Sequence, residues 1–195
     1  MRDSWEFAEL PELRCGKILL RKLRLADTRA LWECLSDPVL TERMMHRRVP
    51  SLSAMEERVR AYLREYETHA NARFGAVSVE DGRLIGSAML TPVQHPARAV
   101  LGFYVNRSCW GRGYARDMVS AILRFGFEQA GMNRIEGTCF AENTASARVM
   151  ERCGMQCEGL AEDYYYVNGR LRDVRRFALL RRDWEKWNGT GDAAR

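Results

Sequence analysis

Trp110-Gly111-Arg112-Gly113-Tyr114-Ala115 is the stretch of the 195-residue sequence that decides the fold. An apolar strand pattern, Val100–Val105, precedes it, and an amphipathic helix pattern begins near Tyr114. Glycines at 111 and 113 allow positive φ angles, so a tight turn can aim successive backbone N–H groups at one point. The N-terminus of the following helix adds unpaired N–H groups and the positive end of its dipole. The pattern predicts an anion site of the kind that suits a pyrophosphate.

Basic side chains surround this turn at positions 107, 112 and 116, all of them arginine. The glycines alone are also compatible with an ordinary strand-to-helix turn, and that alternative stays open here. Two other nucleotide sites are excluded. The chain has no G-x-x-x-x-G-K-[ST] string, and Arg116 stands where a dinucleotide-binding fingerprint requires a third small residue.

Working outward, the periodicity predicts one α/β domain with the element order β-α-α-β-β-β-α-β-α-β-β. Two hairpins are expected, at Glu80-Asp81-Gly82 and at Asn168-Gly169. Ser53 and Glu56 have the spacing of a capping box, and Asp27 is a candidate N-cap of the first helix. The expected strands are 17–25, 73–80, 83–92, 98–105, 134–140, 157–167 and 171–180, and the expected helices are 28–35, 53–69, 114–130 and 144–153.

Composition narrows the class of protein. With 46% hydrophobic residues and a net charge of +5, the chain can build a core and suits an anionic partner. No apolar run approaches the length of a membrane span, and the N-terminal residues lack the apolar core of a signal peptide, so we expect a cytoplasmic protein. Six scattered cysteines and three isolated histidines have no metal-ligand spacing, which predicts reduced thiols and no metal site.

Several motifs together resemble the GNAT (GCN5-related) N-acetyltransferases. Trp110–Ala115 resembles their motif A, Q/R-x-x-G-x-G/A, and a Trp at its first position is common in the branch that resembles the RimJ/RimL ribosomal-protein N-acetyltransferases. The resemblance extends over residues 17–184. Its other motifs are Leu20-Arg21-Lys22-Leu23, Ser36-Asp37-Pro38, Leu84-Ile85-Gly86, Asn143-Thr144-Ala145-Ser146, Cys153-Gly154-Met155 and Tyr166-Val167-Asn168-Gly169 with Asp173.

The resemblance implies a single-domain GNAT fold, a mixed seven-stranded sheet flanked by about four helices, with splayed fourth (98–105) and fifth (134–140) strands. We expect residues 1–16 to be an N-terminal extension, 17–187 the acetyltransferase domain and 188–195 a disordered tail. Gly102 is a candidate for a bulge that splays the strands, and crowding by a neighbouring helix is the alternative.

The family also implies acetyl-CoA as cosubstrate and assigns its binding residues by position. The pantetheine is expected to pair with the backbone of Tyr104 and Val105 and to contact Asn143, which could instead simply cap a helix. The pyrophosphate is expected on the N–H groups of the turn. The cofactor-binding residues carried over are Tyr104, Val105, Trp110, Gly111, Arg112, Gly113, Tyr114, Ala115, Asn143 and Ser146.

The chain departs from its relatives at the acid and base. Met150 replaces a tyrosine that many GNAT enzymes use as an acid, and Val100 replaces a common glutamate. Ser146 stands where RimL-like enzymes use a serine toward the thiolate. The base is expected to be a water held by Tyr165, Glu162 or Asp163, or the amine loses its proton on entering the site.

For the acceptor, residues 36–70 contain six arginines and six acidic residues. A site for a polyamine or an aminoglycoside should concentrate acids, so the prediction is the N-terminal amine of a protein or peptide. The alternatives are a small polyamine-like or aminoglycoside acceptor and a non-catalytic acyl-CoA-binding module. Nucleic acid and membrane partners are not expected, and monomer and homodimer both stay open.

Overall fold

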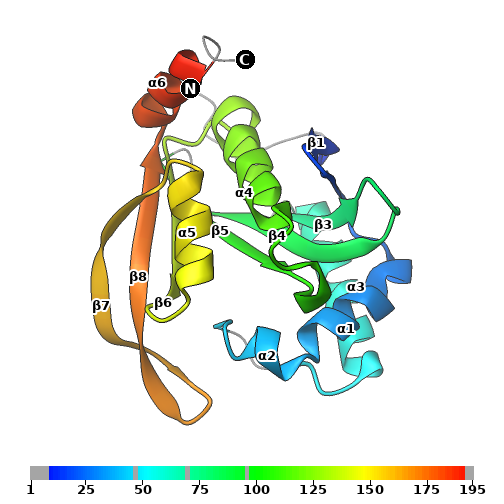
Figure 1. The fold of residues 1–195 in the computed structure, drawn as a ribbon. Coiled ribbons are helices and arrows are strands. Elements are labelled where there is room, and N and C mark those ends of the chain that lie inside the picture. Colours follow the sequence, from blue (N-terminus) through cyan, green and yellow to red (C-terminus); the bar gives the residue numbers. More distant parts are fainter. Residues whose placement is uncertain (1–8, 46–47, 69–70, 95–96, 192–195) are drawn as a thin grey trace.

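The computed structural model describes residues 9–45, 48–68, 71–94 and 97–191. Within these ranges the chain forms one mixed sheet in the order β1-β2-β3-β4-β5-β6-β8-β7 (Figure 1). The strands are β1 (Leu13–Cys15), β2 (Ile18–Arg21), β3 (Ala72–Ser78), β4 (Leu84–Gln94), β5 (Arg98–Val105), β6 (Arg134–Phe140), β7 (Gln156–Val167) and β8 (Arg170–Leu180). The helices are α1 (Thr28–Leu35), α2 (Pro38–Thr41), α3 (Leu52–Thr68), α4 (Tyr114–Arg124), α5 (Thr144–Arg152) and α6 (Arg181–Gly191).

The α/β class and the single mixed sheet are confirmed, but the expected numbers of strands and helices are corrected to eight and six in the described residues. The additional elements are short or weakly patterned. β1 has three residues, inside the expected N-terminal extension, and α2 has four, too few to show a period. The expected disordered tail, 188–195, is wrong up to Gly191, because these residues belong to α6; residues 192–195 lie outside the described ranges.

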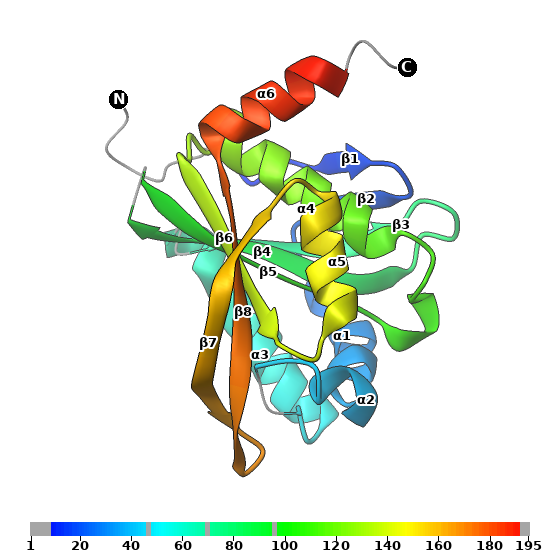
Figure 2. The same cartoon turned by 60° about the vertical axis from the view of Figure 1, so that its left-hand side comes forward.

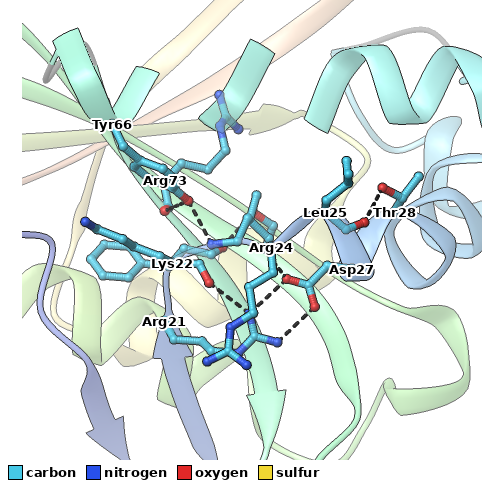
Figure 3. A network of polar contacts seen from close by, with 11 residues as sticks. Arg21, Lys22, Arg24, Leu25, Asp27, Thr28, Tyr66 and Arg73 are labelled. Atoms are coloured by element: carbon cyan, nitrogen blue, oxygen red, sulfur yellow. Dashed lines mark hydrogen bonds and ion pairs between the residues drawn. The ribbon is translucent and has the colours of Figure 1, made fainter. Parts of the chain in front are cut away.

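The first expected strand, 17–25, ends earlier, at Arg21, because Asp27 folds the chain back. Its carboxylate accepts hydrogen bonds from both terminal nitrogens of Arg21, at 2.8 and 2.9 Å, and from the Arg24 N–H at 2.7 Å (Figure 3). These bonds form a 3-10 turn, Leu25–Asp27, ahead of α1. Asp27 is thus at the expected N-cap position, but its side chain makes no cap bond to α1.

Tyr66 attaches α3 to the sheet through its hydroxyl. The hydroxyl accepts from the Leu23 N–H at 2.9 Å and donates to the Arg73 carbonyl at 2.7 Å (Figure 3). A single side chain therefore satisfies two backbone groups, one in the turn after β2 and one in β3, and fixes the helix over this face of the sheet.

Turn and cap predictions had mixed outcomes. Positive φ angles at Asn168 (53°) and Gly169 (80°) confirm the predicted hairpin between β7 and β8. The capping box at Ser53 is wrong: α3 begins one residue earlier, so Ser51 caps it by accepting from the Ala54 N–H at 3.1 Å.

Two clusters of buried side chains hold the layers together. One packs α4 and α5 against the sheet and contains Phe74, Met118, Ile122, Met150 and Phe177. The other packs α1 and α3 against the turn after β2 and contains Leu23, Leu31, Met55 and Val59. Figure 2 shows α4 and α5 side by side in front of the sheet, with α1 and α2 at its lower edge.

The only parallel pair in the described sheet, β5 and β6, lies at its centre. Their register runs from Arg98 opposite Arg134 to Leu101 opposite Gly137. Beyond this point each strand continues with its other neighbour: β5 pairs with β4 as far as Val105, and β6 pairs with β8 as far as Phe140. After β5 the chain passes through residues 106–113, which include the 3-10 turn Arg107–Cys109, before α4 begins, and three residues separate α5 from β6.

Candidate active site

The turn between β5 and α4 has the backbone conformation that its glycines predicted. Gly111 has φ of 77° and Gly113 has φ of 87°, and Gly113 is the N-cap residue of α4. A β-carbon built on either glycine meets no atom within 4 Å, so both face open space. Because a helix N-terminus leaves its first N–H groups without intrahelical acceptors, this turn presents donors in a place that an anion can approach.

Trp110 fixes the start of the turn to the end of β5. Its indole N–H donates to the Val105 carbonyl at 2.8 Å, and the guanidinium of Arg43 lies 5.2 Å from the ring centroid. Tyr114 is buried in the core below α4, and Ala115 packs against that core. The side chains of Tyr114 and Ala115 therefore hold the helix, which leaves their backbone to face a ligand.

The three arginines around the turn differ in their surroundings. All three are exposed, and Arg107 also forms an ion pair with Asp37, Nε to Oδ2 at 2.8 Å. Arg112 also lines an open depression of about 470 Å³ together with Lys17, Glu80 and Tyr114. Arg112 and Arg116 thus extend into solvent beside the anion site.

Tyr104 and Val105 lie in the part of β5 beyond its pairing with β6. The Tyr104 ring packs with the cluster below α1 and α3, where burial raises the pKa of its phenol, so the group stays protonated at neutral pH. The expected bulge at Gly102 is wrong, because the β4 ladder is regular through this position. The nearest atom to a β-carbon built there is Met89 Cε at 2.9 Å, the flexible end of a side chain on β4, so the alternative of crowding by a helix is not observed either.

Asn143 caps α5, as the alternative for this residue predicted. Its Oδ1 accepts from the Ser146 N–H at 3.2 Å, and its Nδ2 donates to the Arg43 carbonyl at 3.4 Å. Ser146 lies half-buried on the first turn of α5. Asn143 and Trp110 therefore both contact Arg43, and Ser146 is attached to Asn143 through the cap bond.

Tyr165 belongs to a separate cluster at the end of β6. Its ring packs edge-on against Phe140, with centroids 6.4 Å apart, beside Val167, Val174 and Met45. Glu162 and Asp163, the other residues expected near the base, lie exposed where the β7–β8 register shifts. Of these three residues, Tyr165 is the one that packs toward β6.

The segment Asp37–Met45, which we call the α2 strap, lies within residues 36–70, where the acceptor site was expected, but its long-range contacts were not predicted. Besides the Asp37–Arg107 pair and the contacts of Arg43, its Met45 Sδ lies 3.7 Å from Thr138 Oγ1. Glu42 accepts hydrogen bonds from Asn168, Arg170 and Arg172 of the β7–β8 hairpin, at 3.2, 2.6 and 3.1 Å. The strap thereby connects the glycine turn before α4, the β6–α5 turn and the β7–β8 hairpin.

Arg172 is the second group that was missed. Its guanidinium contacts Glu42 and Glu142 and stacks over the Phe140 ring at 4.1 Å. The alternation of β8 contains a signal for it, because Arg172 shares the inward face with Val174. Hydrogen bonding from Arg170 lowers the pKa of Glu42; burial acts to raise the pKa of Glu142, but bonds from its own backbone N–H and from Arg172 prevail and lower it.

Other chemistries have no site in the described part of the chain. It contains no group of three His, Cys, Asp or Glu side chains that could hold a metal. None of its helices has the length and apolarity to cross a membrane. Burial raises the pKa of the Cys34 thiol to about 12 and that of Cys139 to about 11, so neither is a thiolate at neutral pH.

Comparisons with known proteins agree with this geometry. A family model described as an acetyltransferase (GNAT) domain matches residues 17–156. An uncharacterized N-acetyltransferase, p20, of Bacillus licheniformis is 32% identical over 86% of this chain and 95% of the relative. The [ribosomal protein uS5]-alanine N-acetyltransferase of Escherichia coli is 26% identical over 57% of this chain and 58% of that protein. A crystal structure of the Vibrio cholerae spermidine N-acetyltransferase with CoA and spermine covers 87% of this chain and 98% of its own, with a TM-score of 0.77 and 22% identity.

Proposed function

The chain belongs to the GNAT acetyltransferase family, and from this premise we propose that it transfers the acetyl group of acetyl-CoA to the N-terminal amine of a protein or peptide. Its activity as a GNAT N-acetyltransferase follows from the family, whereas the acceptor is our proposal. Relatives differ in this respect, since one acts on an alanine of ribosomal protein uS5 and another on spermidine.

The observation that carries the donor site is the open turn of Gly111 and Gly113 at the N-terminus of α4. Its unpaired N–H groups would hold the pyrophosphate, with the side chains of Arg112 and Trp110 beside it. From there the pantetheine would run along Tyr104 and Val105, in the part of β5 that no longer pairs with β6, and reach Asn143 on the far side. The expected splaying of the two strands is part of this proposal.

Acetyl-CoA, when bound, supplies the activated acetyl thioester. A neutral amine that attacks a thioester has to lose a proton, and the departing thiolate has to gain one. We assign the second task to the Ser146 hydroxyl, because it lies half-buried on the first turn of α5 beside Asn143. Tyr165 is assigned to the acceptor side, where it packs on Phe140 and would hold a water for the amine proton.

The acceptor proposal depends on how the carboxylates near the site are occupied. Of the six acidic residues in 36–70, four form ion pairs, namely Asp37 with Arg107, Glu42 with Arg170, Glu56 with Arg60 and Glu65 with Arg73. A polyamine or aminoglycoside requires several free carboxylates for its ammonium groups. Because arginines already neutralise these acids, a single amine on a peptide suits the site better.

A thiol-release assay with acetyl-CoA tests this proposal across three acceptor panels: peptides with N-terminal Ser or Ala, spermidine with spermine, and aminoglycosides. We expect turnover with the peptides. Rapid turnover of spermidine or an aminoglycoside with none of the peptides would contradict the peptide acceptor while leaving the enzyme class intact.

Replacement of Ser146 by alanine tests the proposed acid. We expect a lower kcat with α5 intact, since the Asn143 cap bond uses the backbone N–H of residue 146, which alanine retains. Arg148→Ala, an exposed substitution on the same helix, is the control. An unchanged kcat for Ser146→Ala at saturating substrates would remove the serine from the mechanism.

A further inference from the structure

A buried guanidinium lies between two carboxylates at the point where the α2 strap, the β6–α5 turn and the hairpin meet. The Arg172 side chain is 6% exposed, whereas those of Glu42 and Glu142 are 49% and 57% exposed. Arg172 Nη1 donates to Glu42, and Nη2 donates to Glu142. A charge this deeply buried is tolerated only when it is paired, so its two partners determine where it lies.

The two carboxylates belong to different walls of the proposed active site. Glu42 ends α2 and directly precedes Arg43, whose side chain contacts Trp110. Glu142 directly precedes Asn143, which caps α5 and is the proposed contact of the pantetheine. One guanidinium thus holds the acceptor wall, on the strap, and the cofactor wall, at the α5 N-terminus.

Arg172 retains an unsatisfied donor in this arrangement. Its Nε–H is buried and has no hydrogen-bond partner among the described residues. An unpaired buried donor is unfavourable, and its presence calls for an explanation other than stability. The guanidinium is oriented so that its two terminal nitrogens reach both carboxylates, and Nε is left over because of that orientation.

Arg170, two residues away, provides the contrast. It also donates to Glu42, but its side chain is 59% exposed, and it acts on Glu142 through longer-range electrostatics and not through a described hydrogen bond or ion pair. An exposed pair of this kind contributes little and is screened by salt. Arg170 and Arg172 therefore share the strap partner and differ in whether they reach the cofactor wall.

We propose that Arg172 is a positioning residue that transmits the state of the acceptor wall to the cofactor wall through its simultaneous bonds to Glu42 and Glu142. A change in the strap alters the position of the guanidinium, and with it the position of Glu142 and the adjacent Asn143. The inference rests on the proposed donor site, and it adds an energetic connection between donor and acceptor binding.

Calorimetric titration of the full chain with CoA tests the proposal without an acceptor, in a cycle of native protein, Glu42→Gln, Arg172→Met and the double variant. We expect Glu42→Gln to weaken CoA binding by roughly 5-fold or more in the native background. In the Arg172→Met background the same substitution should change the CoA affinity by less than about 2-fold, because the guanidinium that connects Glu42 to Glu142 and Asn143 is absent. Arg170→Met, the matched control, should stay within about 2-fold of the native affinity.

The outcomes separate this inference from the proposed function. If the native chain does not bind CoA, the proposed donor site is wrong, and the proposed coupling is overturned together with it. If CoA binds but Glu42→Gln has the same effect in both backgrounds, or Arg170→Met acts like Arg172→Met, the coupling alone is overturned. Where Arg172→Met does not fold, Glu142→Met replaces it in the cycle, because it removes the acceptor of the second bond and retains the guanidinium.

Discussion

Replacement of Gly113 by alanine tests whether the turn before α4 receives the pyrophosphate. Gly113 has φ of 87° and ψ of −9°, a left-handed conformation that an L-residue adopts only with strain. A built β-carbon meets no atom within 4 Å, so the substitution adds a conformational penalty and no steric clash in the free protein. The penalty is about 1–2 kcal/mol, which for a chain of this size lowers the Tm by roughly 2–8 °C.

Gly82 is a matched control for this substitution. It has φ of 69°, lies in the turn between β3 and β4, and likewise has no atom within 4 Å of a built β-carbon. Gly82→Ala should therefore destabilise the protein by about the same 1–2 kcal/mol. Since the two variants share the folding penalty, any difference in CoA affinity reports the position of the turn relative to the ligand.

We expect Gly113→Ala, and not Gly82→Ala, to weaken CoA binding. The added methyl group, or the shift of the backbone away from positive φ, removes at least one charge-assisted hydrogen bond to phosphate. Such a bond contributes about 1.5–3 kcal/mol, which corresponds to roughly 10- to 150-fold in Kd. Calorimetry with CoA measures the affinity, and thermal unfolding measures the shared penalty. Equal CoA affinity in the two variants would refute the assignment of the phosphate to this turn.

Three further perturbations test the site and its support. Arg112→Ala should weaken CoA binding by about 1 kcal/mol at low salt, because the side chain is exposed; an effect that does not shrink in titrations at high salt would contradict a screened ion pair. Tyr66→Phe should lower the free energy of unfolding by about 1–3 kcal/mol, since two backbone groups lose their partner, while CoA affinity stays unchanged. The pKa values of Glu42 and Glu142 are lower in the folded than in the unfolded chain, so both carboxylates add to the free energy of unfolding above the unfolded-state pKa of about 4.3. This contribution is lost as the pH falls through the folded-state pKa values. In denaturant unfolding, the free energy of unfolding of the double Gln variant should therefore fall less steeply with acidification than that of the native chain.

Features that depend on neighbours in the sequence were predicted well. The turn at 110–115, the Asn168-Gly169 hairpin and the helix that begins at Tyr114 all lie where their local patterns placed them. Their physical causes act over a few residues: positive φ at a glycine, the free N–H groups of a first helical turn, and the alternation of a strand. The prediction of Ser53 as the cap was wrong although capping is also local, because the sequence offers two serines, at 51 and 53, and Ser51 makes the cap bond.

The acceptor side required contacts that no local pattern contains. Arg172 meets Glu42 across 130 positions, and Asn143 meets the Arg43 carbonyl across 100. The strap that brings them together is built on a helix of four residues, too short for a periodic signal. Arg172 itself was visible only as a charge on the inward face of a strand, and without its partners it could have been a surface residue at a twisted edge.

This difference in range explains why the donor is easier to identify than the acceptor. The donor's phosphate interacts with backbone groups that a short, contiguous stretch presents, so the stretch alone reveals the class of ligand. The proposed acceptor wall lies on the strap and is connected to the β6–α5 turn through Arg172 of β8, and each of these side chains is chemically ordinary in isolation. If Arg172 transmits strain between these elements, then a substitution in the strap also changes donor affinity, and acceptor specificity in this chain cannot be altered one residue at a time. Relatives do differ in acceptor, since one is an alanine acetyltransferase of ribosomal protein uS5 and another a spermidine acetyltransferase.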